Sequence, residues 1–219
     1  MNLKGKTMGV IMYSPIIHNG VEWDEMETDF QSWPADKEAL CERYGLPRTA
    51  FHFLFVGHGY KRKGLDLLLR ALSQLPKEDV FLSVVGKDKR MEWYQSYADQ
   101  LGIGDRVRFF GPQQDSRPFY QLADSLVIPS FYDPFANVTV EALAMGLFVV
   151  SSKNNGGHEI LDEKNGAVIE NLLDPEEVAS ALENSLAHRK TKESARFARL
   201  SVAHLDFSKQ LNKLINACG

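Results

Sequence analysis

The chain has 219 residues, of which 44% are hydrophobic and 25% are charged. This composition supports one sizeable hydrophobic core with terminal extensions and excludes an intrinsically disordered chain. The net charge of −4 at pH 7 argues against a nucleic-acid-binding protein, because such proteins present an overall basic face.

The sequence also indicates where the protein resides. Cys41 and Cys218 lie far apart without metal-ligand spacing, which predicts free thiols in a reducing compartment. No apolar run approaches the roughly 20 residues that span a bilayer, and the first residues lack the apolar centre of a signal peptide. We therefore expect a cytoplasmic protein and leave open peripheral contact with the inner membrane.

Short apolar runs alternate with helical patterns through the middle of the chain, as in repeated βαβ units. The expected strands are 51–56, 80–85, 106–110, 125–128, 147–151 and 167–170. The expected helices are 64–75, 91–101, 118–123, 138–145 and two or three more within 175–217. This order predicts an α/β fold with a doubly wound, Rossmann-like parallel sheet of about six strands. Such sheets bind ligands beyond the carboxyl ends of their strands.

The two ends of the chain differ from this middle part. Residues 1–35 contain a strand-like apolar run at 8–13 and an acidic, aromatic stretch, and they predict a connecting segment. We expect the ligand-binding domain to cover 36–204 and a separate C-terminal helix to cover 205–219.

The loop 57–64 leaves a strand, opens a helix and is rich in glycine and cations, which favours phosphate binding. It is not a Walker A loop, because Leu65 and Asp66 follow its last glycine. It is not a dinucleotide fingerprint either, since Arg62 stands at the third glycine position. Arg62 and Lys63 beside a helix amino terminus suit an anion, although they would also fit a solvated surface. A second basic cluster, Lys87, Lys89 and Arg90, suits a small anion in the same way.

The stretch 130–141 contains two carboxylates eight residues apart, Asp133 and Glu141. At about 1.5 Å rise per residue they would lie about 12 Å apart. That exceeds the roughly 10 Å limit for the carboxylate pair of a hydrolase but suits the two ends of an elongated ligand. The alternative is that Asp133 caps a helix with Pro134 at its first position and that Glu141 is an exposed helix residue.

The loop 152–158 contains paired glycines, which allow a backbone to approach a ligand closely. His158 stands beside Glu159, but no further ligand follows at metal spacing. We therefore expect no metal site and interpret His158 as a turn or packing residue.

In their joint order, these motifs resemble the retaining glycosyltransferases of family 4, which have the GT-B fold. The resemblance runs from about Ser14 to the last helices and is most specific over 51–169. Its motifs are Phe-Val-Gly ending at Gly57, Lys-Arg-Lys-Gly ending at Gly64, Val-Val-Gly ending at Gly86, Arg-Phe-Phe-Gly ending at Gly111, the Asp133–Glu141 pair, and Gly-Gly-His-Glu ending at Glu159. The chain looks most like the lipopolysaccharide-core branch, whose type member adds glucose to an inner-core heptose.

The resemblance implies a role for each matching position. Arg62 and Lys63 match the pair that neutralises the donor diphosphate as the bond to the sugar breaks. Asp133 matches the acid that contacts sugar hydroxyls, and Glu141 matches the acid that contacts the ribose. The positions that match the family's donor-binding residues are Gly57, Phe110 at the strand end near the base, Ala136, Asn137, Val138 and Glu141. The family needs no metal or other cofactor, because the basic pair does that work.

The chain departs from the family pattern in two respects. The first acid is Asp133 where the family has Glu, which leaves the donor sugar undetermined. The segment 14–21 resembles the entry into the second of the two domains of such enzymes, so the acceptor-binding domain is expected to be missing.

Three functions follow as alternatives. The leading one is the donor half of a hexosyltransferase that uses a nucleotide sugar, such as UDP-glucose, and a lipopolysaccharide or related glycan acceptor. The second is a stand-alone nucleotide-sugar-binding module or partner subunit without turnover. The third is a nucleotide-sugar epimerase, which shares the GT-B fold.

Overall fold

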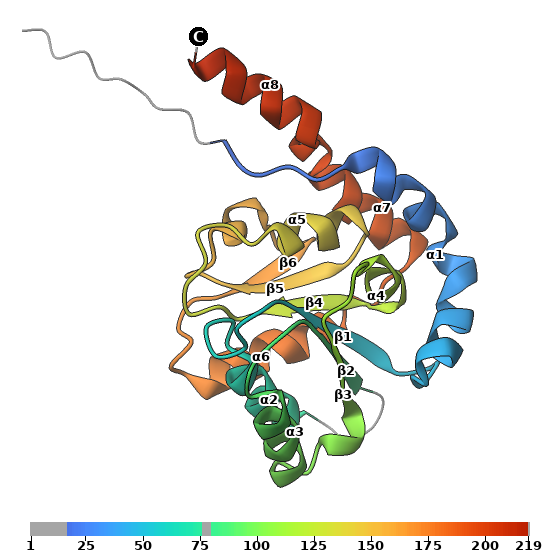
Figure 1. Ribbon diagram of the computed structural model, residues 1–219, viewed down its shortest axis with the longest axis vertical. Coiled ribbons are helices and arrows are strands. Elements are labelled where there is room, and N and C mark those ends of the chain that lie inside the picture. Colours follow the sequence, from blue (N-terminus) through green and yellow to red (C-terminus); the bar gives the residue numbers. More distant parts are fainter. Residues whose placement is uncertain (1–16, 76–79, 219) are drawn as a thin grey trace, which may run out of the picture.

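A six-stranded parallel sheet forms the centre of the computed structural model, which describes residues 17–75 and 80–218 (Figure 1). Its strand order is β3-β2-β1-β4-β5-β6. The strands are β1 Phe51–Val56, β2 Val80–Val85, β3 Val107–Gly111, β4 Ser125–Ile128, β5 Phe148–Ser152 and β6 Gly166–Ile169. The predicted sheet is thus confirmed, each strand within one residue of its expected bounds. The expected strand at 8–13 lies outside the described residues.

Helices cover both faces of the sheet, as expected for a doubly wound fold. In Figure 1, α2, α3 and α6 lie on one face, and α4, α5 and α7 lie on the other, with α1 beyond α4. The helices are α1 Trp23–Tyr44, α2 Leu65–Gln74, α3 Met91–Gln100, α4 Arg117–Leu122, α5 Asn137–Ala144, α6 Pro175–Leu186, α7 Lys192–Ser201 and α8 Phe207–Cys218. Short 3₁₀ turns occupy Gly104–Arg106, Gly156–Ile160 and Ala203–Leu205.

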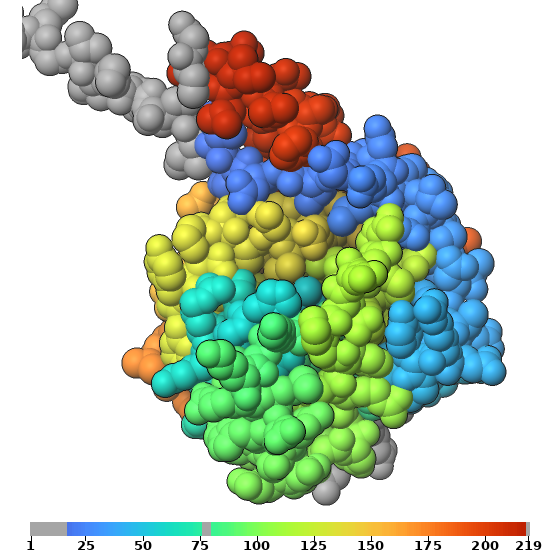
Figure 2. All heavy atoms as spheres, in the orientation of Figure 1, coloured from blue at the N-terminus to red at the C-terminus, as the bar shows by residue number. Residues whose placement is uncertain are grey.

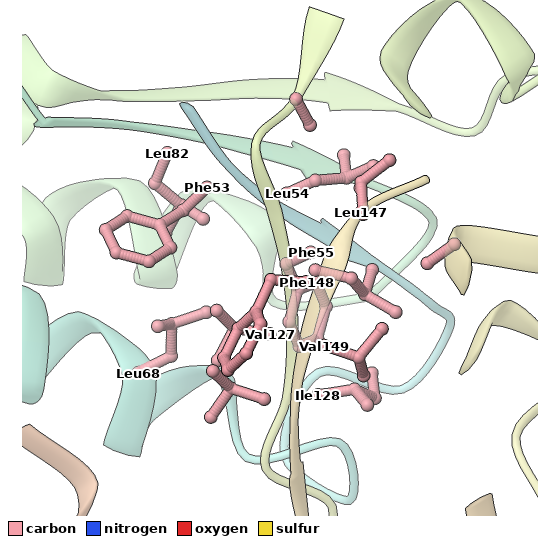
Figure 3. Close-up of a cluster of buried hydrophobic side chains, with 14 of the residues drawn as sticks. Phe53, Leu54, Phe55, Leu68, Leu82, Val127, Ile128, Leu147, Phe148 and Val149 are labelled. Atoms are coloured by element: carbon pink, nitrogen blue, oxygen red, sulfur yellow. The ribbon is translucent and has the colours of Figure 1, made fainter. Parts of the chain in front are cut away.

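The core lies on both faces of the central strands (Figure 3). Phe53, Leu54 and Phe55 of β1 are fully buried, although neighbouring side chains of a strand point to opposite faces. Strands covered by helices on both faces have nearly continuous apolar sequences, which explains the apolar run 53–56 in β1. Val127 of β4 and Leu68 of α2 complete this cluster. The buried strands give the loops at their carboxyl ends a rigid base.

Helix α1 was not predicted, and the expected boundary between 35 and 36 falls inside it. Its sequence contains Pro34 and has only a weak apolar stripe, so tertiary contacts hold it in place. The Gln121 side chain of α4 donates to the backbone carbonyl of Asp29, 3.0 Å away. The ammonium of Lys37 lies 3.0 Å from the buried carboxylate of Asp124. The described part of the acidic, aromatic stretch therefore packs against the sheet domain as part of α1.

The C-terminal helix expected within 205–219 is present as α8, which extends away from the sheet (Figure 1). Its apolar side chains Phe207, Leu211, Leu214 and Ile215 are exposed. None of the helices in the described part of the chain has the length and apolar character needed to cross a bilayer.

Candidate functional site

The strand order reverses between β1 and β4, and doubly wound sheets bind ligands at the carboxyl ends of the two strands that flank such a reversal. The β1–α2 loop, 57–64, and the β4–α5 loop, 129–136, meet at this point. The Arg62 carbonyl accepts a hydrogen bond of 2.9 Å from the backbone amide of Phe131. Gly64 has a φ of +73°, and a Cβ there would lie 2.0 Å from the Pro129 carbonyl oxygen. Glycine is therefore required where the two loops touch.

The basic pair predicted from the sequence converges on the predicted acid. Nη1 of Arg62 lies 3.1 Å from Oδ2 of Asp133, and Nζ of Lys63 donates to the same oxygen. Lys63 and Asp133 are buried, whereas half of the Arg62 side chain is exposed. Arg62 also donates to the Tyr132 carbonyl at 2.8 Å. The pair is therefore not a solvated surface cluster, and it faces a single carboxylate.

The pKa of Asp133 reflects this pairing. Burial alone would raise the pKa of its carboxyl, but hydrogen bonds and charges from Lys63 and then Arg62 outweigh burial and lower the pKa below its ordinary value. Asp133 is therefore ionised at neutral pH and neutralises much of the positive charge of the two cations.

Helix α5 begins at Asn137, directly after the loop that carries Asp133. Ala136 is its N-cap residue, and within the described ranges no side chain caps this end. An uncapped amino terminus presents backbone amides and partial positive charge toward an anion. The alternative that Asp133 caps this helix is therefore wrong, because its carboxylate binds the two cations instead.

The predicted contact residues of the α5 turn differ in exposure. Ala136 is buried and Val138 is half-buried, whereas Asn137 is exposed. Oδ1 of Asn137 accepts a hydrogen bond of 2.8 Å from Nδ2 of Asn19, which lies before α1 near the start of the described chain.

Asn155, which the sequence did not single out, organises this loop. Its Oδ1 accepts hydrogen bonds of 3.1 Å from the backbone amides of both Ala136 and Gly157, and its Nδ2 donates to Ser151 Oγ at 2.9 Å. A Cβ on Gly156 would lie 1.9 Å from the Pro134 carbonyl oxygen. The sequence signal that could have identified Asn155 is its position immediately before the glycine pair 156–157.

Glu141 lies on the second turn of α5 and is half-buried, so it is not an exposed helix residue as the alternative required. The buried hydroxyl of Tyr120 donates to its Oε2 at 2.7 Å. Burial raises the pKa of Glu141, and the hydrogen bond from Tyr120 offsets only part of that rise. Glu141, Arg117 and Gly20 line a shared cavity of about 300 Å³.

Tyr120→Phe is expected to lower the free energy of unfolding by about 1 to 2 kcal/mol, because it removes the hydrogen-bond donor to a partly buried carboxylate. It is also expected to raise the pKa of Glu141 further, since the lost hydrogen bond lowers it. Urea denaturation tests the first effect. Tyr132→Phe is the control, because that side chain is 65% exposed. Equal stability of the two variants would rule out this role for Tyr120.

Gly57 lies at the end of β1, where its amide donates to the Val85 carbonyl at 2.9 Å. The methylene stem of Lys63 packs over it, 3.4 Å from where a Cβ would stand. Gly86, at the end of β2, has a φ of +137°, and a Cβ there would lie 1.9 Å from the Gly57 carbonyl oxygen. Gly86 must therefore be glycine for the two strand ends to approach each other.

Phe110, the residue expected near the base, is half-buried in β3. Its ring packs against Phe119 at 4.8 Å and against Tyr44 at 5.5 Å between centroids. The structure therefore places its side chain against α1 and α4 rather than beside the Arg62, Lys63 and Asp133 cluster.

His158 behaves as a turn residue, since its Nδ1 lies 2.9 Å from the Asn155 carbonyl oxygen. Over residues 17–75 and 80–218, no group of three or more His, Cys, Asp or Glu side chains is arranged to hold a metal ion. Cys41 is a free, buried thiol.

Comparison with known families identifies the domain. The family model described as "Glycosyl transferases group 1" matches residues 36–199. The lipopolysaccharide core biosynthesis glycosyltransferase LpsE of Rhizobium meliloti is 34% identical over 142 residues, covering 64% of this chain and 41% of LpsE. The lipopolysaccharide glucosyltransferase WaaG of Escherichia coli is 30% identical over 157 residues, covering 70% of this chain and 42% of WaaG. The chain thus spans less than half the length of these relatives.

Solved structures agree on the fold. A glycosyltransferase from Rickettsia africae superposes with a TM-score of 0.81 at 22% identity, covering 92% of this chain and 55% of that one. Anabaena HepE, solved in complex with UDP and glucose, superposes with a TM-score of 0.74 at 20% identity, covering 93% of this chain and 56% of HepE. The predicted Rossmann-like half of a GT-B fold is therefore confirmed.

Proposed function

Because the chain belongs to the glycosyl transferases group 1, we propose that it binds a nucleotide-sugar donor in the crevice between β1 and β4. The observation that carries this proposal is the convergence of Arg62 and Lys63 on one carboxylate, beside the uncapped start of α5. Two cations and free helix amides suit a diphosphate in both charge and geometry.

The chemistry of transfer follows from this placement. When the bond between the sugar and the diphosphate breaks, negative charge grows on the nucleoside diphosphate that leaves. Arg62 and Lys63 stabilise that charge, with the backbone amides at Ala136–Val138 as further donors. Because these cations neutralise the leaving group, the proposed transfer needs no metal ion or other cofactor.

The remaining predicted residues hold the two ends of the donor. Once a diphosphate engages Arg62 and Lys63, the Asp133 carboxylate is free to accept hydrogen bonds from sugar hydroxyls. Glu141, oriented by Tyr120, accepts from the ribose hydroxyls. Gly57 lets the backbone approach the diphosphate. Phe110 marks the carboxyl end of β3, which in this proposal lies near the nucleotide base.

The finer assignment is a retaining, family 4 hexosyltransferase that uses UDP-glucose or a similar donor and a lipopolysaccharide or related glycan acceptor. The names of LpsE and WaaG, and the UDP and glucose bound to HepE, support it. In this proposal a separate acceptor-binding domain completes the site, and transfer takes place in the cytoplasm or at the inner face of the membrane.

Calorimetric titration with UDP, UDP-glucose, UDP-N-acetylglucosamine, GDP-mannose and ADP-glucose tests the donor assignment. We expect one nucleotide to bind in the micromolar to millimolar range and its sugar conjugate to bind at the same site. Failure of the entire panel would contradict the proposed function of this chain.

Glu141→Gln is expected to separate function from stability. The pKa of Glu141 is raised, so the stability linked to its proton is present below the ordinary value of 4.5 and is lost as pH rises through the folded pKa. A neutral side chain avoids that loss, so the variant is expected to be more stable at pH 7 by up to about 1 kcal/mol. It is also expected to bind the nucleotide about tenfold more weakly, because a charge-assisted hydrogen bond to the ribose is lost.

Pyrophosphate is the matched ligand for this variant, since it lacks a ribose. Its affinity should be the same for the wild type and for Glu141→Gln. Equal weakening of pyrophosphate and nucleotide would show that Glu141 does not contact the ribose.

A further inference from the structure

A second group of cations lies beside the proposed donor site and takes no part in it. We define the basic rim as Lys61, Lys87, Lys89 and Arg90, all four of which are exposed. Whereas Arg62 and Lys63 bind Asp133, no member of the basic rim forms an ion pair within the described part of the chain. Since the whole chain carries a net charge of −4, this concentration of positive charge is local.

Backbone contacts hold the basic rim together. The Gly59 amide donates to the Lys87 carbonyl at 3.1 Å, and the Lys87 amide donates to His58 Nδ1 at 2.8 Å. The Asp88 carboxylate accepts from the backbone amides of Tyr60 and Arg90, both at 2.7 Å. The carboxylate of Asp88 therefore binds backbone amides. Lys87, Lys89 and Arg90 line a hollow of about 520 Å³, and Lys61 is exposed on the neighbouring β1–α2 loop.

An exposed aromatic side chain adjoins these cations. Trp93 on the first turn of α3 is 47% exposed, the guanidinium of Arg90 lies 5.3 Å from its ring centroid, and its ring stacks on Tyr97 at 5.1 Å. Figure 2 shows the green α3 segment on the surface next to the cyan β1–α2 segment. Tryptophan is enriched where proteins meet the boundary between lipid headgroups and hydrocarbon, because its ring is amphipathic.

We propose that the basic rim and Trp93 form a contact surface for an anionic membrane, with the cations on lipid phosphates and Trp93 at the level of the headgroups. A cluster of four exposed Lys and Arg side chains attracts an anionic leaflet, and an exposed Trp adds interfacial affinity. A discrete small anion fits less well, because all four cations are exposed and only Lys87, Lys89 and Arg90 line the hollow.

This contact surface has a consequence for the site. The basic rim shares the β1–α2 loop with Arg62 and Lys63, so membrane contact holds the donor crevice close to the lipid surface. Membrane contact through the basic rim is independent of which nucleotide sugar is bound, because neither Arg62 nor Lys63 belongs to the basic rim.

Cosedimentation with vesicles of phosphatidylglycerol and phosphatidylcholine in equal parts, at low ionic strength, tests the proposal. The wild-type chain is expected to bind these vesicles, to bind pure phosphatidylcholine vesicles weakly, and to dissociate in high salt. Replacing Lys87, Lys89 and Arg90 by Gln is expected to lower the partition coefficient by about fivefold per cation, on the order of 100-fold in total.

The matched control replaces Lys153, Lys192 and Arg196 by Gln, which changes the net charge equally at other places on the surface. This control should keep most of the binding, and both triple variants should keep the wild-type circular dichroism spectrum. Trp93→Phe reports the aromatic contact, because the blue shift of tryptophan emission on vesicles should disappear in that variant although Trp23 and Trp33 remain.

Other outcomes overturn the proposal. Equal loss of vesicle binding in both triple variants would show that the basic rim is not the contact surface. Failure of the wild type to bind anionic vesicles would show that the partner is not an anionic membrane. Rim-dependent binding of soluble polyphosphate without vesicle binding would assign the basic rim to a soluble polyanion. Nucleotide titration of the same preparations keeps this result separate from the donor assignment.

Discussion

Replacing Asp133 by asparagine is expected to destabilise the fold by about 3 kcal/mol and, at the same time, to strengthen the binding of nucleoside diphosphates by roughly tenfold. The carboxylate is the partner of Lys63, which is 7% exposed, and of Arg62. Its removal leaves a buried ammonium without a counter-ion, which destabilises the free protein. The same removal frees both cations for a diphosphate, so the ligand no longer competes with Asp133.

Thermal denaturation with and without UDP measures both effects, since a tighter ligand raises the unfolding temperature by a larger increment. Asp115→Asn is the control, because Asp115 pairs with Arg117 at the surface, where an ion pair contributes less than about 1 kcal/mol.

The effect also has a pH signature. Because the pKa of Asp133 is lowered, its stabilisation is present above the ordinary value of 3.8 and is lost as pH falls through the folded pKa. The stability difference between wild type and Asp133→Asn should therefore vanish in strong acid. Weaker UDP binding by the variant would refute the competition between Asp133 and the diphosphate.

Gly64→Ala is expected to destabilise the protein by about 3 kcal/mol, whereas Gly59→Ala is expected to cost only about 1 kcal/mol. The two glycines have nearly the same φ, +73° and +72°, so the strain from a left-handed backbone is common to both. They differ in space, because a Cβ on Gly64 would lie 2.0 Å from the Pro129 carbonyl oxygen, while Gly59 has nothing within 4 Å.

Urea denaturation of both variants isolates the contact between the β1–α2 and β4–α5 loops. Gly64→Ala should also weaken UDP binding more than Gly59→Ala does, since the displaced loop carries Arg62 and Lys63. Equal destabilisation by the two substitutions would show that this loop contact contributes no stability.

The sheet could be predicted because each of its strands has a local sequence signal. Runs such as 51–56 and 80–85 each contain five apolar residues out of six and are followed by glycine, so both the type and the bounds of these strands could be predicted locally. Helix α1 has no such signal: it contains Pro34 and is held by side-chain contacts from α4 and by Lys37 on Asp124. A helix that depends on tertiary contacts cannot be predicted from local periodicity.

The site likewise divides into residues that local sequence identifies and contacts that only the tertiary fold creates. Arg62, Lys63, Asp133 and Glu141 could each be proposed from their loops and from the family resemblance. Their pairing could not, because about 70 residues separate Lys63 from Asp133, and only the adjacency of β1 and β4 brings them together. The alternative that Asp133 caps α5 was wrong for this reason, since local sequence favours a cap but the carboxylate pairs with the distant cations instead.

Titration of UDP into the wild type and into the Arg62→Ala/Lys63→Ala variant tests most directly whether the basic pair holds the diphosphate. Lys87→Ala/Lys89→Ala is the matched control, because it removes the same charge from the neighbouring loop. We expect the first variant to bind at least about 100-fold more weakly, since two charge-assisted contacts are lost, and the control to bind like the wild type. Equal affinities of the wild type and the Arg62→Ala/Lys63→Ala variant would contradict the account.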